Sequence, residues 1–151
     1  MSGIAIQNAT SGRRLPTHKL MRSWIAAVLP ARLQNAELTV RIVEADEIRA
    51  LNRDYRKKDK ATNVLSFPAE LPSDLGLKVL GDLVVCAQVV AEEAAQQGKT
   101  RNAHWAHMLV HGTLHLLGYD HLVDSDAERM EKLEIKILHT LGFANPYEEE
   151  K

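Results

Sequence analysis

The chain has few of the features that cross-link a fold or place a protein in a membrane. Cys86 is the only cysteine among 151 residues, so a disulfide within the chain is excluded and a reducing compartment is expected. No segment approaches the roughly 20 apolar residues that a membrane helix needs, and residues 1–16 lack the apolar core of a secretory signal. The net charge of -1 argues against a protein that coats nucleic acid over its whole surface. We therefore expect a cytoplasmic protein without a membrane partner.

The composition is that of an ordinary globular domain. With 45% hydrophobic and 26% charged residues, the chain can bury one core, and no repeat or linker divides it. We predict a single domain spanning residues 1–151. Alternating apolar residues predict strands near 4–6, 38–42, 61–68 and 80–86, and helical spacing predicts helices between them and after them. This order predicts an α+β fold, in which a small mixed sheet packs against helices.

Three local details follow from the same patterns. Asp46 is predicted to cap the helix near 46–55, whose buried face includes Tyr55. Ser125 and Glu128 are predicted to form the capping box of the last helix. Asp82, near the start of its strand, is interpreted as a turn residue in preference to a partner of a metal ligand.

The stretch HGTLHLLGYDH, from His111 to His121, carries the clearest chemical signal. His111 and His115 are four residues apart, so on a helix their Cβ atoms lie roughly 6 Å apart on one face. Gly118 permits the positive φ that ends a helix and lets the chain bring His121 to the same point. Three imidazoles leave one coordination position open, as in catalytic zinc sites. We predict that these three histidines, at the end of the central helix, bind one Zn²⁺ or another divalent ion.

The spacing of this stretch matches that of metzincin peptidases except at one position. Those enzymes have Glu after the first His as the general base, and this chain has Gly112 there. A zinc peptidase is therefore the less favoured interpretation. His104 and His107 continue the same helical face, where satisfied core or surface histidines are favoured over cleft lining.

A cluster of basic residues precedes the third predicted strand. Two acidic residues, Asp54 and Asp59, interrupt five basic ones within eight positions: Arg53, Arg56, Lys57, Lys58 and Lys60. Taken alone, such a run favours a solvated loop. A basic loop that leads into a strand end could also hold a phosphate chain beside a metal.

Taken together, these blocks resemble the YbeY family, bacterial endoribonucleases that act as rRNA maturation factors. The resemblance is carried, between residues 38 and 142 and in the family's order, by LNRDYRKKDK, ATNVLSFP, LGDLVVC, HWAHM and HGTLHLLGYDH. It implies a metal-dependent, single-strand-specific endoribonuclease, a hydrolase that acts in 16S rRNA 3′-end maturation and in ribosome quality control. It also implies zinc as the usual ion, and single-stranded RNA, rRNA and the ribosome or its proteins as partners.

The resemblance also assigns site residues by motif. His111, His115 and His121 correspond to the family's metal ligands, with His111 also counted as catalytic, and Arg56 corresponds to its functionally important arginine. The family often has Asp where this chain has Asn63, so we leave Asn63 out of the catalytic set.

The chemistry of these residues suits a phosphodiester. Zinc held by three neutral imidazoles keeps its positive charge, so it can stabilise an anionic phosphate and activate water or the ribose 2′-OH. The planar fork of Arg56 suits phosphate oxygens. Asp120 and Asp124 are the candidate acids for orienting the ligand histidines. The alternative outside enzymes is a zinc-containing ribosome assembly factor that binds rRNA without cleaving it.

Overall fold

The computed structural model describes residues 3–69, 78–119 and 124–147. In chain order the elements are β1 (Gly3–Asn8), α1 (His18–Val28), the 3-10 helix η1 (Ala31–Leu33), β2 (Glu37–Val43), α2 (Ala45–Arg56), β3 (Val64–Pro68), β4 (Val79–Cys86), α3 (Ala87–Gln96), α4 (Arg101–Leu116) and α5 (Asp124–Thr140). None of the helices in these ranges is both long and apolar enough to cross a membrane.

The sheet has the strand order β1-β2-β4-β3. β1, β2 and β4 run parallel, and β3 pairs antiparallel with β4 at one edge. The predicted α+β fold with a small mixed sheet is confirmed. β4 is hydrogen-bonded on both sides, which explains why its second half is a continuous apolar run, from Leu83 to Cys86.

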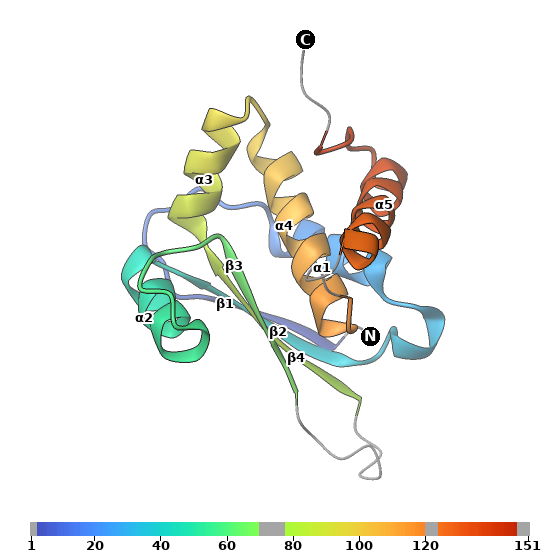
Figure 1. Cartoon of the computed structure of the whole chain (residues 1–151), viewed down its shortest axis with the longest axis horizontal. Coiled ribbons are helices and arrows are strands. Elements are labelled where there is room, and N and C mark those ends of the chain that lie inside the picture. Colours follow the sequence, from blue (N-terminus) through green and yellow to red (C-terminus); the bar gives the residue numbers. More distant parts are fainter. Residues whose placement is uncertain (1–2, 70–77, 120–123, 148–151) are drawn as a thin grey trace.

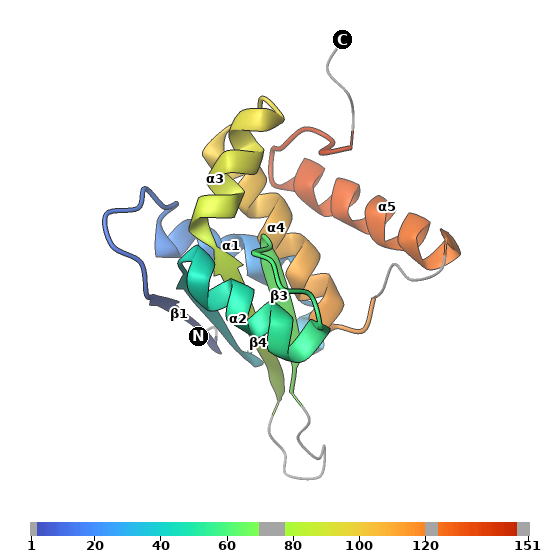
Figure 2. The ribbon, with the colours of Figure 1, turned by 60° about the vertical axis from the view of Figure 1, so that its left-hand side comes forward.

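Helices cover both faces of this sheet (Figures 1 and 2). On one face, Val40 and Leu83 are fully buried in the same core as α1 and α4. On the other face, Leu65 and Val84 pack with Ile48 of α2. Successive strand residues point to opposite faces, so each strand contributes to both cores. α4 lies between α3 and α5 and contacts both of them (Figure 1).

α4 is buried around most of its circumference because it contacts the helices α1, α3 and α5 and the strands β3 and β4. The hydroxyl of Thr100 accepts a hydrogen bond from the amide of Ala103 at 3.1 Å and caps the helix start. Trp105 and Leu109 are 1% and 0% exposed. The central position predicted for this helix is confirmed, and its C-terminal end is therefore fixed by packing on several sides.

The end of α4 is a Schellman motif built on Gly118. Gly118 has a φ of 101°, and its amide donates to the carbonyl of His115 at 3.0 Å. The amide of Tyr119 donates to the carbonyl of Leu114 at 3.1 Å. The predicted positive φ at Gly118 is confirmed, and the chain turns sharply just beyond His115.

The expectations for α2 are partly wrong. Tyr55 is 67% exposed, and Asn52, 3% exposed, occupies the buried face instead. The Tyr55 ring makes an edge-on contact with Phe67 on the sheet face that α2 only partly covers. Asp46 does not cap α2, because the helix begins at Ala45 and Asp46 lies in its first turn.

Two further local expectations are wrong. α5 begins at Asp124, so Ser125 and Glu128 lie inside the helix and Ser125 is not its cap. Asp82 is not a turn residue, because β4 begins three residues earlier and Asp82 pairs with Thr39 and Phe67 in the sheet. Its side chain is exposed on the face that α2 only partly covers.

Candidate functional site

A cleft of about 630 Å³ opens where the C-terminal half of α4 meets β3 and the loop after α2. Arg56 and Lys58 bring positive charge to it, and His111 and His115 lie on its α4 side. The described residues that line it include no Asp or Glu: Arg56, Lys58, Thr62, Asn63, Val64, Leu65, Ser66, Pro68, His111, His115, Gly118 and Tyr119. The structure thus brings together three of the predicted site residues, and the surroundings favour an anionic ligand.

The two histidines of the cleft face each other through their Nε2 atoms, which are 3.1 Å apart. Nδ1 of His111 lies 2.5 Å from Oε1 of Glu134, and Nδ1 of His115 lies 3.0 Å from the carbonyl oxygen of Tyr119. A carboxylate and a carbonyl only accept hydrogen bonds, so each Nδ1 carries the proton. When both rings are neutral, each Nε2 carries a lone pair, and the two atoms are close enough to bind one shared cation.

This geometry fits a metal ion. In a tetrahedral zinc site with Zn–N bonds of about 2.05 Å, two ligand nitrogens lie about 3.3 Å apart, close to the separation of the two Nε2 atoms. His121, the third predicted ligand, lies outside the described residues. Within residues 3–69, 78–119 and 124–147, no group of three potential ligands is placed to hold a metal. The structure therefore shows the converging pair and not the predicted three-histidine site.

A buried carboxylate on α5 holds His111 in this orientation. Glu134 is 0% exposed; its Oε1 binds Nδ1 of His111, and its Oε2 accepts from Nε2 of His107 at 3.1 Å and from the Tyr147 hydroxyl. Burial alone would raise the pKa of Glu134, but the hydrogen bonds from His107, His111 and Tyr147 and the charge of His111 outweigh it and lower the pKa to about 2. Glu134 is thus an ionised carboxylate that receives three donors.

Sequence reasoning missed Glu134 and named Asp120 and Asp124 in its place. Asp120, like the side chain of Asp124, lies outside what the structure describes. One signal could have found Glu134: it lies midway between Met130 and Leu138, both 1% exposed, at the i, i+4 spacing of the buried face of α5. A lone acid on an apolar face indicates a buried partner, because an unpaired charge there is costly.

His104 and His107 are core residues, as favoured from the sequence. They are 2% and 8% exposed, and among the described residues their Nδ1 atoms have no hydrogen-bond partner. Each therefore keeps its proton on Nε2, where His104 donates to Oε1 of Glu93 at 2.9 Å. Burial lowers the pKa of His104, and this effect outweighs the opposing hydrogen bond to Glu93. The lowered pKa favours the neutral ring.

Asn63 joins the cleft to this second carboxylate. Its Nδ2 lies 3.1 and 3.2 Å from the two carboxylate oxygens of Glu93, and its Oδ1 accepts from the amide of Val64 at 2.6 Å. An aspartate at this position would place one carboxylate against another. The amide is therefore required by Glu93, which gives a physical reason for Asn at this position of the chain.

Arg56 is the last residue of α2, and the chain beyond it is tied back to the helix. Lys57 takes a left-handed φ of 62°, and the side chain of buried Asn52 donates to the carbonyl of Lys60 at 3.0 Å. Arg56 donates through Nη2 to the carbonyl of Ser66 at 3.1 Å, which uses one of its five N–H donors. The basic loop is thus held in a fixed path along the cleft.

Gly112 packs directly against the sheet. A Cβ at this position would lie 2.9 Å from Leu83 Cδ2, 3.2 Å from Val64 Cγ2 and 3.3 Å from Ser66 Oγ. The hydroxyl of Ser66 donates to the Gly112 carbonyl at 3.0 Å across the same contact. The position that carries the general base in metzincins therefore faces β3 and β4 at close range, which leaves no room for a longer side chain.

Comparisons with known proteins show the family and the fold of this chain. The family model described as Endoribonuclease YbeY matches residues 5–142. The solution structure of TM1509 from Thermotoga maritima superposes with a TM-score of 0.58 and 26% sequence identity, covering 92% of this chain and 91% of that one. The two chains share the fold along nearly their whole lengths.

The contact at Gly112 predicts a sharp limit on side-chain size. Gly112→Glu should lower the free energy of unfolding by about 3 kcal/mol or more, because a charged side chain would enter the core against β3 and β4. Gly112→Ala should change it by about 1 kcal/mol at most, since the gain in helix propensity offsets the tight contact with Leu83. Urea unfolding followed by circular dichroism measures both, and a Glu variant as stable as the Ala variant would contradict the packing argument.

The Asn63–Glu93 contact predicts a pH-dependent defect. Asn63→Asp should lower the free energy of unfolding by about 2 kcal/mol at pH 8, because two carboxylates would meet in a partly buried site. The repulsion raises the folded-state pKa of the pair above the unfolded value, so the defect should shrink as the pH falls towards 5. The double variant Asn63→Asp with Glu93→Gln restores one donor and should recover most of the loss. A defect independent of pH would contradict this account.

Proposed function

Because the chain belongs to the YbeY family of endoribonucleases, which act in rRNA processing, we propose that the cleft between α4, β3 and the loop at 57–60 cleaves single-stranded RNA in a metal-dependent reaction. The proposal includes 16S rRNA 3′-end maturation and ribosome quality control as its cellular setting. It also includes zinc as the ion and the ribosome as the site of action.

One observation carries the proposal: two convergent imidazole nitrogens lie in a cleft whose described lining residues carry positive charge and no carboxylate. The Nε2 atoms of His111 and His115 are 3.1 Å apart, and Arg56 and Lys58 share the same cavity. A protein with a net charge of -1 that has no carboxylate among the described residues of this lining is suited to a polyanion there.

Each residue has a defined task in this proposal. His111, His115 and His121 hold the metal, which when bound supplies positive charge for the phosphate oxygens in cleavage. Arg56 clamps the scissile or a neighbouring phosphate with the N–H groups that Ser66 leaves unused. The attacking group is water or the ribose 2′-OH. Peptide hydrolysis is not favoured, because Gly112 leaves neither a base nor space for one.

The test is cleavage of an end-labelled single-stranded RNA by purified protein before and after metal removal. We expect cleavage to stop when the metal is stripped by chelation and to return when zinc is restored. Mapping the product ends separates the nucleophiles, since 5′-phosphate ends indicate water and 2′,3′-cyclic phosphates indicate the 2′-OH. Folded, zinc-loaded protein that binds the RNA and leaves it intact would refute the nuclease and favour the assembly factor.

Replacing the cleft arginine should separate clamping from metal binding. Arg56→Ala should lower the cleavage rate by about 100-fold, because it removes a preorganised donor pair at the phosphate, and should leave the metal content unchanged. Arg53→Ala is the matched control: it removes the same charge from the same helix, but Arg53 pairs with Asp54 and does not line the cleft. Equal activity of the two variants would remove Arg56 from the mechanism.

The buried carboxylate should set the affinity of the metal site. All three partners of Glu134 donate, so Glu134→Gln would turn one acceptor into a donor that faces donors, and His111 would lose its fixed orientation. We expect metal affinity to fall by about 10- to 100-fold, measured by competition with a chromogenic chelator. Glu131→Gln, an exposed change on the same helix, should bind metal like the unmodified protein. Tight binding by Glu134→Gln would show that the carboxylate does not orient the ligand.

A further inference from the structure

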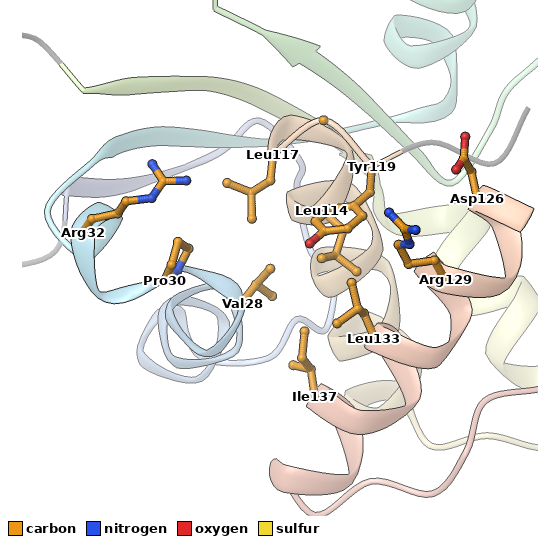
Figure 3. A pocket seen from close by; sticks show the side chains of 11 residues that line it. Val28, Pro30, Arg32, Leu114, Leu117, Tyr119, Asp126, Arg129, Leu133 and Ile137 are labelled. Atoms are coloured by element: carbon orange, nitrogen blue, oxygen red, sulfur yellow. The ribbon is translucent and has the colours of Figure 1, made fainter.

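A second cavity, of about 540 Å³, lies on the other side of the turn that ends α4 (Figure 3). Its walls come from the end of α1 and η1, from the last turn of α4 and the turn after it, and from α5 between Asp126 and Ile137. The described lining residues are Val28, Pro30, Arg32, Leu114, Leu117, Gly118, Tyr119, Asp126, Arg129, Leu133 and Ile137. None of the roles proposed above uses this cavity.

The cavity adjoins the cleft that holds the histidines. Gly118 and Tyr119 line both of them, so only the thickness of this turn separates the two. Gly118 adds no side chain to that boundary, and a Cβ there would meet no atom of the described residues within 4 Å. The two cavities are therefore neighbours, and one nucleic-acid strand could contact both.

The lining combines an apolar floor with positive charge at both ends. Figure 3 shows the side chains of Val28, Leu117 and Leu133 between Arg32 at one end and Arg129 at the other. Both arginines are exposed, and in the described parts of the chain neither forms an ion pair. Asp126 is the single acidic residue among the described lining residues.

The η1 end of the cavity is fixed by a third cation. The ammonium group of Lys78 donates to the carbonyl of Arg32 at 2.9 Å and fastens η1 there. Tyr119 is partly buried against the core and also lines the cavity, so its aromatic ring is held in place as a surface on which a base can stack. Apolar surface, an aromatic ring and flanking guanidinium groups form the set of contacts that binds a nucleotide of a single strand through its base and its phosphates.

We infer that this cavity is a nucleotide subsite, which takes a base of the same RNA strand outside the scissile position and holds the adjoining phosphates on Arg32 and Arg129. The inference rests on the proposed function, because it assigns the occupant from the shared boundary of the cavity and the cleft. An acidic, apolar protein segment would meet the same charges, but its binding would have no relation to the neighbouring cleft. RNA is therefore the occupant that the shared boundary favours.

The test compares two RNAs that differ only in reach. Cleavage of an oligonucleotide of about four nucleotides, which fills the cleft, is measured beside that of one of about ten, which also reaches the cavity, as kcat/KM. We expect the unmodified protein to favour the long RNA. Arg129→Gln and Arg32→Gln should each lower the long-to-short ratio by about 5- to 10-fold and reduce the salt dependence of long-RNA binding by about one counterion. Lys132→Gln removes a charge from the exposed side of α5 outside this lining and should keep the ratio unchanged.

Replacement of the ring at the boundary shared with the cleft gives a second measurement. Tyr119→Leu keeps the backbone carbonyl that binds His115 and removes the stacking surface, so it should weaken long-RNA binding by about tenfold and keep metal content unchanged. Equal kcat/KM for the two RNAs, or an unchanged ratio in both arginine variants, would overturn the subsite and leave a protein segment as the occupant to test. Failure of the proposed function looks different, because neither RNA would then be cleaved by any form of the protein.

Discussion

One residue, Ser66, joins the two halves of the cleft. Its hydroxyl donates to the carbonyl of Gly112 on α4, and its own carbonyl accepts from Arg56 at the end of α2. α2 and α4 lie on opposite faces of the sheet, so no direct contact between those helices could set the distance between Arg56 and His111. Through these two hydrogen bonds, Ser66 of the edge strand β3 brings Arg56, from the helix layer on one face, beside the histidines of α4 on the other face.

The histidines of α4 depend on two carboxylates from the helices on either side. Glu93 of α3 holds His104, and Glu134 of α5 holds both His107 and His111. A helix with four histidines on one face would otherwise bury donors without acceptors, which costs about 1–3 kcal/mol each. α3 and α5 therefore do more than cover the core: Glu93 pairs with His104, and Glu134 fixes the tautomer of His111, one of the two histidines in the cleft.

The sequence predicted what has a short-range or periodic signature. Strand and helix periodicity gave the mixed sheet and the central helix, and Gly118 gave the positive φ that ends it. What it missed depends on contacts between distant segments. Tyr55 was expected inside by helical spacing, but Asn52 faces in because it binds the carbonyl of Lys60, and a propensity argument contains no such partner. Glu134 was missed for the same reason, since its three donors come from α4 and the C-terminal segment.

The position after the first histidine shows how packing can decide chemistry. In a metzincin-like spacing, the side chain of this residue would have to reach the metal site to act as a base. Here a Cβ at Gly112 would instead lie against Leu83 and Val64 of the sheet. The close approach of α4 to β3 needs a residue without a side chain, and the same approach gives Ser66 its bond to the helix. Gly112 therefore lacks the proton acceptor of a peptidase, and its carbonyl binds Ser66, which in turn binds Arg56. With that acceptor gone, and with no carboxylate among the described lining residues, an anion such as a phosphodiester is the substrate that the cleft can stabilise.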